Sequence, residues 1–387
     1  MCGIVGYAGN IETACGKPLE VCLQGLERLE YRGYDSAGVA LTAPGMDKVV
    51  VRKKAGRLKN LVEDIERKPM PLATVGIGHT RWATNGEPSD VNAHPHTSMD
   101  GKVAIIHNGI IENASQLRLD LQAEGYRFAS ATDTEVAAKL LGKIVDKIIA
   151  DEGKPDLFKA VRRMARMLEG AFTILATDCR QPDIVVGARH DSPLVVGLGE
   201  GENFLGSDVA AFVAYTKRAM EVDQDQAVCV SADKVIVADF NGNVVENPKT
   251  YTVDWDASAA EKGGWDSFMD KEIHEDPAAV QRTLLGRFDT NGDITLDEVR
   301  IDEHDFKAID KIIVVACGTA SYAGQARLAV QIRASGQLNG ALDELNALKP
   351  EAFFLRLYQQ RFGSDAPPEL MAAFGELLDA PAAEGAA

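Results

Sequence analysis

Short apolar runs alternate with helical patterns along the first 240 residues of this 387-residue chain. The runs are rich in valine and isoleucine, have the length of β-strands and are separated by glycine-rich turns. They cover residues 3–8, 74–78, 103–107, 172–176, 184–188, 194–197, 227–230 and 235–238. Many short strands of this kind favour an α/β (α+β) fold, in which mainly antiparallel sheets are covered by helices on their outer faces.

Two segments repeat apolar residues at helical spacing. The first repeat consists of Leu19, Cys22, Leu23, Leu26 and Leu29. The second consists of Val136, Leu140, Ile144 and Ile148, and it follows Thr134, which we expect to cap the helix. Each helix has one apolar face and can therefore cover a sheet.

The pattern changes after residue 240. Residues 241–310 are charged and rich in turn dipeptides, and are predicted to form an interdomain linker. Acidic and amide side chains alternate over residues 289–297 as in a calcium loop, but Gly292 stands two places too early and Arg300 occupies the position of the bidentate glutamate. A solvated hairpin that turns at Asn291-Gly292 is therefore favoured over a calcium site.

The last part of the chain begins a second domain and does not complete it. Residues 311–335 read as a strand, a turn and a helix, the first half of a βαβ unit. A parallel strand needs a second one after the crossover, yet residues 336–387 contain no valine, isoleucine or threonine. We expect residues 1–240 to form the first domain and residues 336–387 a helical and disordered tail.

The charge and the cysteines restrict the partners and the compartment that we expect. The formal net charge is -17 and the acidic residues are spread along the chain, so that nucleic acid and anionic membranes would be repelled. No run approaches the ~18 apolar residues of a membrane span. Six widely separated cysteines are typical of reduced thiols. The sequence therefore predicts a cytoplasmic protein with neither a nucleic-acid nor a membrane partner.

The N-terminus offers a nucleophile and a base in one residue. Removal of Met1 leaves Cys2 with a thiol and a free α-amine. An α-amine has a pKa of about 7.7 to 8.0, so it can take the thiol proton on attack and return it to a leaving group. The alternative is that Cys2 is only a small apolar residue of the first strand.

Thiol attack on an amide produces an oxyanion, and His107-Asn108-Gly109 can supply donors for it. Gly109 lets a backbone N–H approach a substrate closely, and the Asn108 side chain offers a second donor. The alternative is an ordinary Asn-Gly hairpin turn.

A free amino acid such as glutamine needs one opposite charge for its carboxylate and one for its ammonium group. Arg81 suits the carboxylate and Asp133 the ammonium group. Arg81 lies in a loop, residues 78–88, that is rich in polar and aromatic side chains. Alternatively, both are surface charges, or Asp133 only caps a helix.

Six motifs in this order resemble the class II (N-terminal nucleophile) glutamine amidotransferases, and among them the glutaminase domain of the glucosamine-6-phosphate synthases. The motifs are residues 1–6, 29–38, 79–84, 93–96, 107–113 and 132–135. The resemblance extends to about Gly324 and implies an αββα sandwich. It also implies that residues 268–287 belong to an interdomain segment.

The resemblance implies a role for each matched residue. Cys2 would be the nucleophile, and Asn108 and Gly109 would form the oxyanion hole. Arg81, Thr84 and Asp133 would hold glutamine, and Trp82 would gate an ammonia channel. No cofactor and no metal is expected, because the resemblance makes His94, His96 and His107 structural or substrate-flanking residues. Asn85 departs from the family, which often has histidine at this position.

Residues 315–321 resemble the start of the family's sugar isomerase (SIS) domain. There a turn formed by Gly318, Thr319 and Ser321 would cradle the phosphate of a sugar such as fructose 6-phosphate. The other phosphate-binding loops and the isomerising groups have no counterpart after Gly324.

Three interpretations follow. The first is that the chain is the glutaminase part of such a synthase, with a second copy of the chain in a homodimer as one candidate partner. The second is that it is a non-catalytic truncated or fused subunit. The third is that it is another class II amidotransferase, such as the phosphoribosyl-transferring kind. The third lacks support, because no acidic diphosphoribose-binding strand with its Gly-Thr turn is present.

Overall fold

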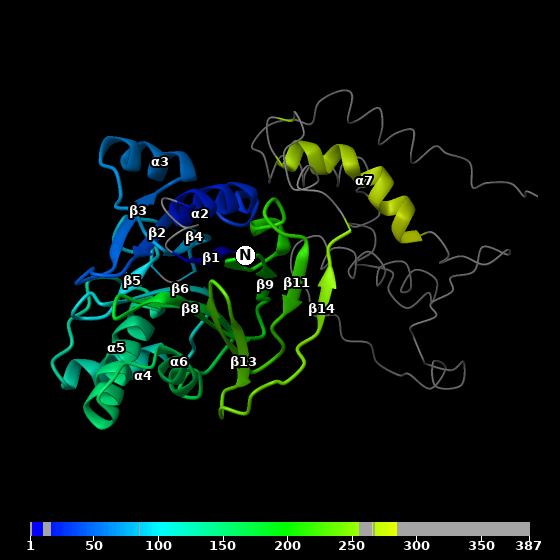
Figure 1. Ribbon diagram of the computed structural model, residues 1–387. Helices are drawn as coiled ribbons and strands as arrows, with labels where there is room; N and C mark the ends of the chain where they lie inside the picture. The colour runs from blue at the N-terminus through cyan, green and yellow to red at the C-terminus, as the bar shows by residue number, and fades with distance from the viewer. Residues whose placement is uncertain (1, 11–16, 85, 255–264, 266–267, 285–387) are drawn as a thin grey trace, which may run out of the picture. The chain divides into compact units, whose positions relative to one another are not determined.

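The computed structural model describes residues 2–10, 17–84, 86–254, 265 and 268–284. Two β-sheets pack face to face, and helices cover both outer faces (Figure 1). The predicted αββα sandwich is therefore confirmed. The calcium-like segment, the partial SIS unit with Gly318, Thr319 and Ser321, and the tail all lie outside the described residues.

The two sheets are antiparallel at every pairing among the described strands. The first sheet has the order β14 (Thr250–Thr252), β11 (Arg218–Glu221), β9 (Val195–Leu198), β10 (Glu202–Gly206), β1 (Gly3–Gly9), β4 (Val75–Arg81), β2 (Ser36–Thr42) and β3 (Val50–Ala55). The second has the order β13 (Val235–Asp239), β12 (Gln226–Ser231), β8 (Gln181–His190), β7 (Phe172–Asp178), β6 (Val103–Gly109) and β5 (His96–Thr97).

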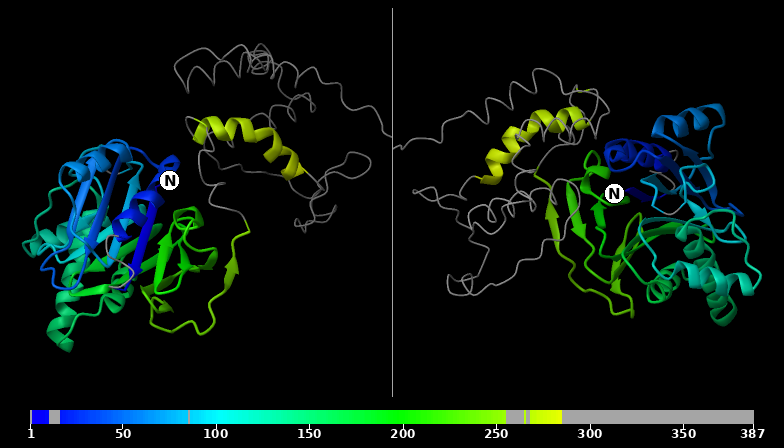
Figure 2. Two further views of the ribbon diagram at one scale, coloured as in Figure 1. Left: turned by 45° about the horizontal axis from the view of Figure 1, so that its top comes forward. Right: turned by 180° about the vertical axis from the view of Figure 1, so that it is seen from behind.

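The helices divide between the two outer faces, as Figure 2 shows from behind. Two helices, α2 (Lys17–Arg28) and α3 (Leu58–Arg67), pack on the first sheet. Three helices cover the second: α5 (Asp133–Glu152) and α6 (Leu157–Ala165) pack on its strands, and α4 (Ala114–Ala123) packs against α5. The described residues also include two short 3₁₀ turns, Glu30–Arg32 and Val209–Ala211, and the helix α7 (Phe268–Leu284).

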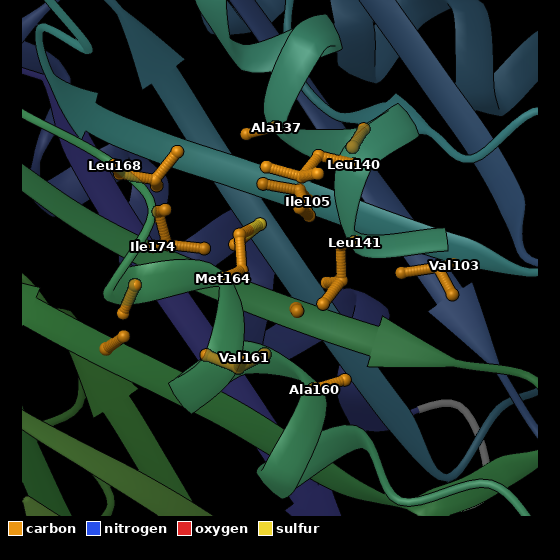
Figure 3. Packing of buried hydrophobic residues seen from close by; sticks show 14 of the residues in the cluster. Val103, Ile105, Ala137, Leu140, Leu141, Ala160, Val161, Met164, Leu168 and Ile174 are labelled. Carbon is orange, nitrogen blue, oxygen red and sulfur yellow. The ribbon is translucent and has the colours of Figure 1, made fainter. Parts of the chain in front are cut away.

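The alternation of side chains along the strands creates three apolar layers. In β1, Val5 and Tyr7 pack toward α2, whereas Ile4 and Ala8 pack between the sheets. In the second sheet, Ile105 belongs to the outer layer that α5 and α6 cover (Figure 3). The middle layer is formed by strands of both sheets, from Ile4 in β1 to Val237 in β13.

This alternation decides which polar side chains lie between the sheets. His79 and Arg81 lie on the same face of β4 as Ile77, which is buried in the layer between the sheets. Asn108 lies on the same face of β6 as Ile106, which belongs to that layer. The two sheets therefore direct polar groups toward each other at one end of the sandwich.

All eight predicted strands are present, but the prediction of the cap on α5 was wrong. Thr132, not Thr134, is the N-cap, because its Oγ1 accepts a hydrogen bond from the Glu135 N–H at 3.2 Å. The strand β14 pairs with β11, so the first sheet continues into residues that the sequence assigns to the linker. No helix among the described residues has the length and apolarity needed to cross a membrane.

Candidate active site

The thiol of Cys2 lies against the backbone of Trp82. The Trp82 N–H donates to Cys2 Sγ at 3.2 Å, and the thiol faces the Trp82 carbonyl oxygen at 3.6 Å. These contacts arise because β1 and β4 are paired, with Gly3 opposite Thr80. Burial raises the pKa of the Cys2 thiol, and the Trp82 N–H and the Arg81 charge oppose this rise.

Asn108 reaches Cys2, the residue that precedes β1 of the other sheet. Its Nδ2 donates to the Cys2 carbonyl oxygen at 2.9 Å, and its Oδ1 lies 2.9 Å from Nε2 of His79. An amide nitrogen has two hydrogens, so one N–H of Nδ2 is left for a group beside Cys2. The structure thus brings Cys2 and Asn108 together across 106 residues of sequence.

Gly109 ends β6 in a conformation that only glycine adopts without strain. Its φ is +118°, and a Cβ at this position would lie 2.0 Å from the carbonyl oxygen of Ala171. Asn108 and Gly109 pair with Thr173 and Phe172 in the β6–β7 ladder. The hairpin-turn alternative is therefore wrong, because these two residues continue a strand.

Asp133 is the first residue of α5 and is buried. Its Oδ2 accepts a hydrogen bond from the Ile111 N–H at 3.0 Å, and its Oδ1 accepts one from the Thr134 N–H at 2.9 Å. Ile111 follows Gly109 closely along the chain. Asp133 therefore fixes the backbone just after β6 to the start of α5.

Arg81 ends β4 and is buried, so it is not a surface charge. Its Nη2 donates to the carbonyl oxygen of Gly86 at 3.3 Å. Burial lowers the pKa of its guanidinium, and the charges of Cys2 and Asp133 oppose this effect. Arg81 is thus within electrostatic reach of both.

Two other predicted site residues lie at the surface. Trp82 is 41% exposed, and its ring packs edge to face on Tyr34 with the centroids 5.5 Å apart. Thr84 is exposed. Asn85 lies outside the described residues.

Asp35, to which the sequence motifs assign no role, supports the loop that carries Trp82. Asp35 Oδ2 accepts from the Ala83 N–H at 2.8 Å, and the Asp35 N–H donates to the Arg81 carbonyl oxygen at 3.0 Å. Gly33 permits this approach, because a Cβ there would lie 2.9 Å from the Trp82 nitrogen. In the sequence, the glycine of Tyr31-Arg32-Gly33-Tyr34 is the feature that indicates such a close approach of two backbone segments.

Four histidines, His79, His94, His96 and His107, are buried beside Asn108 and the start of α5. Burial lowers the pKa of His79 to about 3 and holds the pKa values of His94 and His96 well below the ordinary value. It also lowers the pKa of His107, against the opposing charge of Asp133. The rings are therefore neutral. Within the part of the chain that the structure describes, no three His, Cys, Asp or Glu side chains are grouped so that they could hold a metal ion.

Comparison with known proteins matches residues 79–214 to the glutamine amidotransferase domain family. The chain is also similar to proteins named glutamine--fructose-6-phosphate aminotransferase [isomerizing]. The protein of Corynebacterium diphtheriae is 55% identical over 334 residues, which are 86% of this chain and 52% of that protein. The protein of Streptomyces coelicolor is 53% identical over 324 residues, 84% of this chain and 50% of that protein. The chain spans about half the length of the curated relatives it matches.

The solved structures give the same fold. The glutamine phosphoribosylpyrophosphate amidotransferase of B. subtilis, complexed with ADP and GMP, matches with a TM-score of 0.51 and 25% identity, over 63% of this chain and 50% of that chain. A structure described as the allosteric regulatory enzyme of purine biosynthesis matches with a TM-score of 0.51 and 23% identity, over 66% of this chain and 55% of that chain. The sandwich, the matched domain and the relatives together show that the chain belongs to the class II glutamine amidotransferases.

Proposed function

We propose that this chain hydrolyses L-glutamine to glutamate and ammonia through Cys2, as the glutaminase part of glucosamine-6-phosphate synthesis. The observation that supports this most directly is the meeting of Cys2 with Asn108 and with the Trp82 backbone at one end of the sandwich. A thiol and an amide donor are groups that attack on a carboxamide requires, and the buried guanidinium of Arg81 can hold the carboxylate of the substrate.

The first step forms a thioester. After removal of Met1, the α-amine of Cys2 takes the thiol proton, and the sulfur attacks the side-chain carbonyl carbon of glutamine. The carbonyl oxygen becomes an oxyanion, which accepts the second N–H of Asn108 Nδ2 and the backbone N–H of Gly109. The C–N bond breaks, and the protonated amine returns its proton to the leaving nitrogen, so that ammonia departs.

The second step restores the thiol. Water attacks the thioester carbonyl with the α-amine as base, and the C–S bond breaks to give glutamate and the free thiol of Cys2. The Trp82 N–H, which lies 3.2 Å from Cys2 Sγ, stabilises the sulfur whenever it carries negative charge. The same small group of atoms thus serves both steps.

Substrate binding relies on two opposite charges. Arg81 would pair with the glutamine carboxylate and Asp133 with its ammonium group, with Thr84 as a further polar contact. Asp133 keeps acceptor capacity, because each carboxylate oxygen carries more than one lone pair. Trp82, exposed beside Cys2, would cover the bound substrate and direct the ammonia.

The test is ammonia and glutamate release by the purified full-length chain. C2A should abolish release and should also abolish labelling by a glutamine-analogue electrophile. C229A is the matched control, because burial raises the pKa of the Cys229 thiol to about 12 and keeps it unreactive. If wild-type protein releases no ammonia, or if C2A retains release, the proposal is wrong and the non-catalytic interpretation is favoured.

A second candidate is the complete transfer of ammonia to fructose 6-phosphate, because the 55% identity covers 334 residues and thus extends beyond the amidotransferase domain. Gly318, Thr319 and Ser321 would then contact the sugar phosphate. Amino-sugar formation from glutamine and fructose 6-phosphate would support it, and so would a fructose-6-phosphate-dependent rise in glutamine hydrolysis. A rate of glutamine hydrolysis that does not change with fructose 6-phosphate would support the glutaminase activity alone. Sedimentation of the same sample tests a homodimer, and cell fractionation tests the cytoplasmic location.

A further inference from the structure

A hydrogen bond joins the two sheets directly behind Cys2. Nε2 of His79, on β4 of the first sheet, lies 2.9 Å from Oδ1 of Asn108, on β6 of the second. His79 is 0% exposed and Asn108 is 7% exposed. The contact is therefore shielded from water, which could otherwise replace either partner.

The side-chain amide of Asn108 has two possible orientations that exchange its oxygen and nitrogen. Only one of them turns the nitrogen toward Cys2, where it can donate to an oxyanion. In the opposite orientation, the amide oxygen would face the oxyanion and repel it. Two contacts select the first orientation: the Cys2 carbonyl oxygen accepts from Nδ2, and a donor on the other side of the amide binds the oxygen and excludes the nitrogen.

His79 can be this donor only in one form. A neutral imidazole carries its proton on one nitrogen, and the form with hydrogen on Nε2 donates to Asn108 Oδ1. The His79 ring lies 4.4 Å from that of His94 between centroids, so its position is fixed by packing. Burial keeps the pKa of His79 at about 3, so the ring is neutral at neutral pH.

We infer that His79 is a positioning residue for the glutaminase reaction, and that its Nε2–H holds the Asn108 amide with the nitrogen directed at the oxyanion. This inference rests on the proposed function. His79 does not touch the substrate and acts through Asn108 alone. Its contribution should therefore appear in kcat and vanish when the Asn108 amide is absent.

Two substitutions at position 79 separate the hydrogen bond from the ring. The amide nitrogen of glutamine extends as far along the side chain as Nε2 of histidine, whereas that of asparagine extends only to the position of Nδ1. We expect H79N to lower kcat for glutamine about 10- to 100-fold with little change in KM, and H79Q to restore most of it. Equal activity of H79N, H79Q and wild type would overturn the inference.

A double-mutant cycle shows whether His79 acts through Asn108. In an N108A background, H79N should cause no further loss of kcat, whereas two independent contributions would multiply. Alkylation of Cys2 by iodoacetamide is the parallel measurement, because this displacement develops no oxyanion. Its rate should be the same in wild type and H79N. A loss of alkylation equal to the loss of hydrolysis would mean that H79N disturbs Cys2 itself and would overturn the inference.

The tautomer of His79 can be measured without any activity. The ¹⁵N chemical shifts of the ring in the wild-type chain should show hydrogen on Nε2. Hydrogen on Nδ1 would contradict the inference even in an active enzyme. Absence of ammonia release with hydrogen on Nε2 would instead disprove the proposed function and leave the orientation of the amide established, so that the two failures are distinguishable.

Discussion

The carboxylate of Asp35 accepts a hydrogen bond from the backbone N–H of Ala83 at 2.8 Å. Ala83 follows Trp82, whose own N–H lies 3.2 Å from Cys2 Sγ. Asp35 thus fixes the backbone that contacts Cys2. The 3₁₀ turn Glu30–Arg32 and Gly33 precede Asp35, and the backbone at Gly33 lies directly against that of Arg81 and Trp82.

Substitution of Asp35 should therefore impair catalysis through the loop. We expect D35A to lower kcat/KM for glutamine about tenfold, because one hydrogen bond of about 1.4 kcal/mol is lost. D35N keeps an acceptor and should lose less. The Asp35 charge also raises the pKa of the Cys2 thiol, so the pH profile of iodoacetamide alkylation should move to lower pH in D35N. An unmoved profile together with unchanged kcat/KM would show that Asp35 does not influence the site.

Gly109 offers a second test, with Gly125 as its control. Both have positive φ, +118° and +92°, but a Cβ at Gly109 would lie 2.0 Å from the Ala171 carbonyl oxygen, whereas at Gly125 nothing lies within 4 Å. G125A should cost about 1 to 2 kcal/mol from backbone strain alone and leave glutamine hydrolysis intact. G109A should cost about 3 kcal/mol or more and abolish hydrolysis. Urea unfolding and ammonia release measure both effects, and an active G109A would contradict the role of this backbone.

Thr132 caps the start of α5, directly before Asp133. Its Oγ1 accepts from the Glu135 N–H at 3.2 Å and also lies 3.0 Å from His96 Nε2. T132V removes these contacts and also the 2.8 Å hydrogen bond between Thr132 Oγ1 and Ser130 Oγ, all in a buried place, and should reduce the free energy of unfolding by about 2 kcal/mol or more. It should also raise KM for glutamine, because Asp133 is the next residue. T132S retains the hydroxyl and should behave like wild type; a loss as large as that of T132V would attribute the effect to the methyl group instead.

Sequence periodicity predicted the strands whose side chains are large and apolar, but it missed β2, β3, β5, β10, β11 and β14. The strand β2, Ser36–Thr42, is buried on both faces although it consists largely of small residues, and β3 carries Arg52, Lys53 and Lys54. The strand β2 has no run of valine and isoleucine, and the valines at positions 49–51 lead directly into the three charged residues of β3. Their strand state comes from pairing with β4 and with each other, which no local window reveals.

The same limit applies to the site. Cys2, Arg81, Asn108, Gly109 and Asp133 could be proposed from the sequence because each residue type suits one chemical task. The supporting contacts could not, because a hydrogen bond such as that of Asp35 with Ala83 spans 48 residues and depends on sheet register. Whether Thr132 or Thr134 caps the helix likewise depends on the residue at which the backbone becomes helical, and a sequence pattern does not locate that residue to within one or two positions.

The buried histidines predict how stability depends on pH. The pKa of His79 is about 3 in the folded chain against an ordinary value of 6.5, and those of His94 and His96 are also lowered. Below about pH 6.5 the unfolded chain binds protons on these rings and the folded chain does not. Stability is therefore fully present above pH 6.5 and is lost as the pH falls toward 3, by about 1.4 kcal/mol per pH unit for each ring.

Urea unfolding at pH 7.5, 6.0 and 5.0 measures this loss. Carboxylates such as Glu135, whose pKa is lowered from the ordinary 4.5 in the folded chain, add to the slope near pH 5, and a variant that lacks one ring removes this shared contribution by comparison. H79Q replaces one ring by a group that does not titrate, so its slope should be smaller than that of wild type by about 1.4 kcal/mol per pH unit. If the free energy of unfolding stayed constant from pH 7.5 to 5.0, these rings would have to be protonated or solvated in the folded chain. The Nε2–H of His79 would then no longer be the shielded donor that orients Asn108.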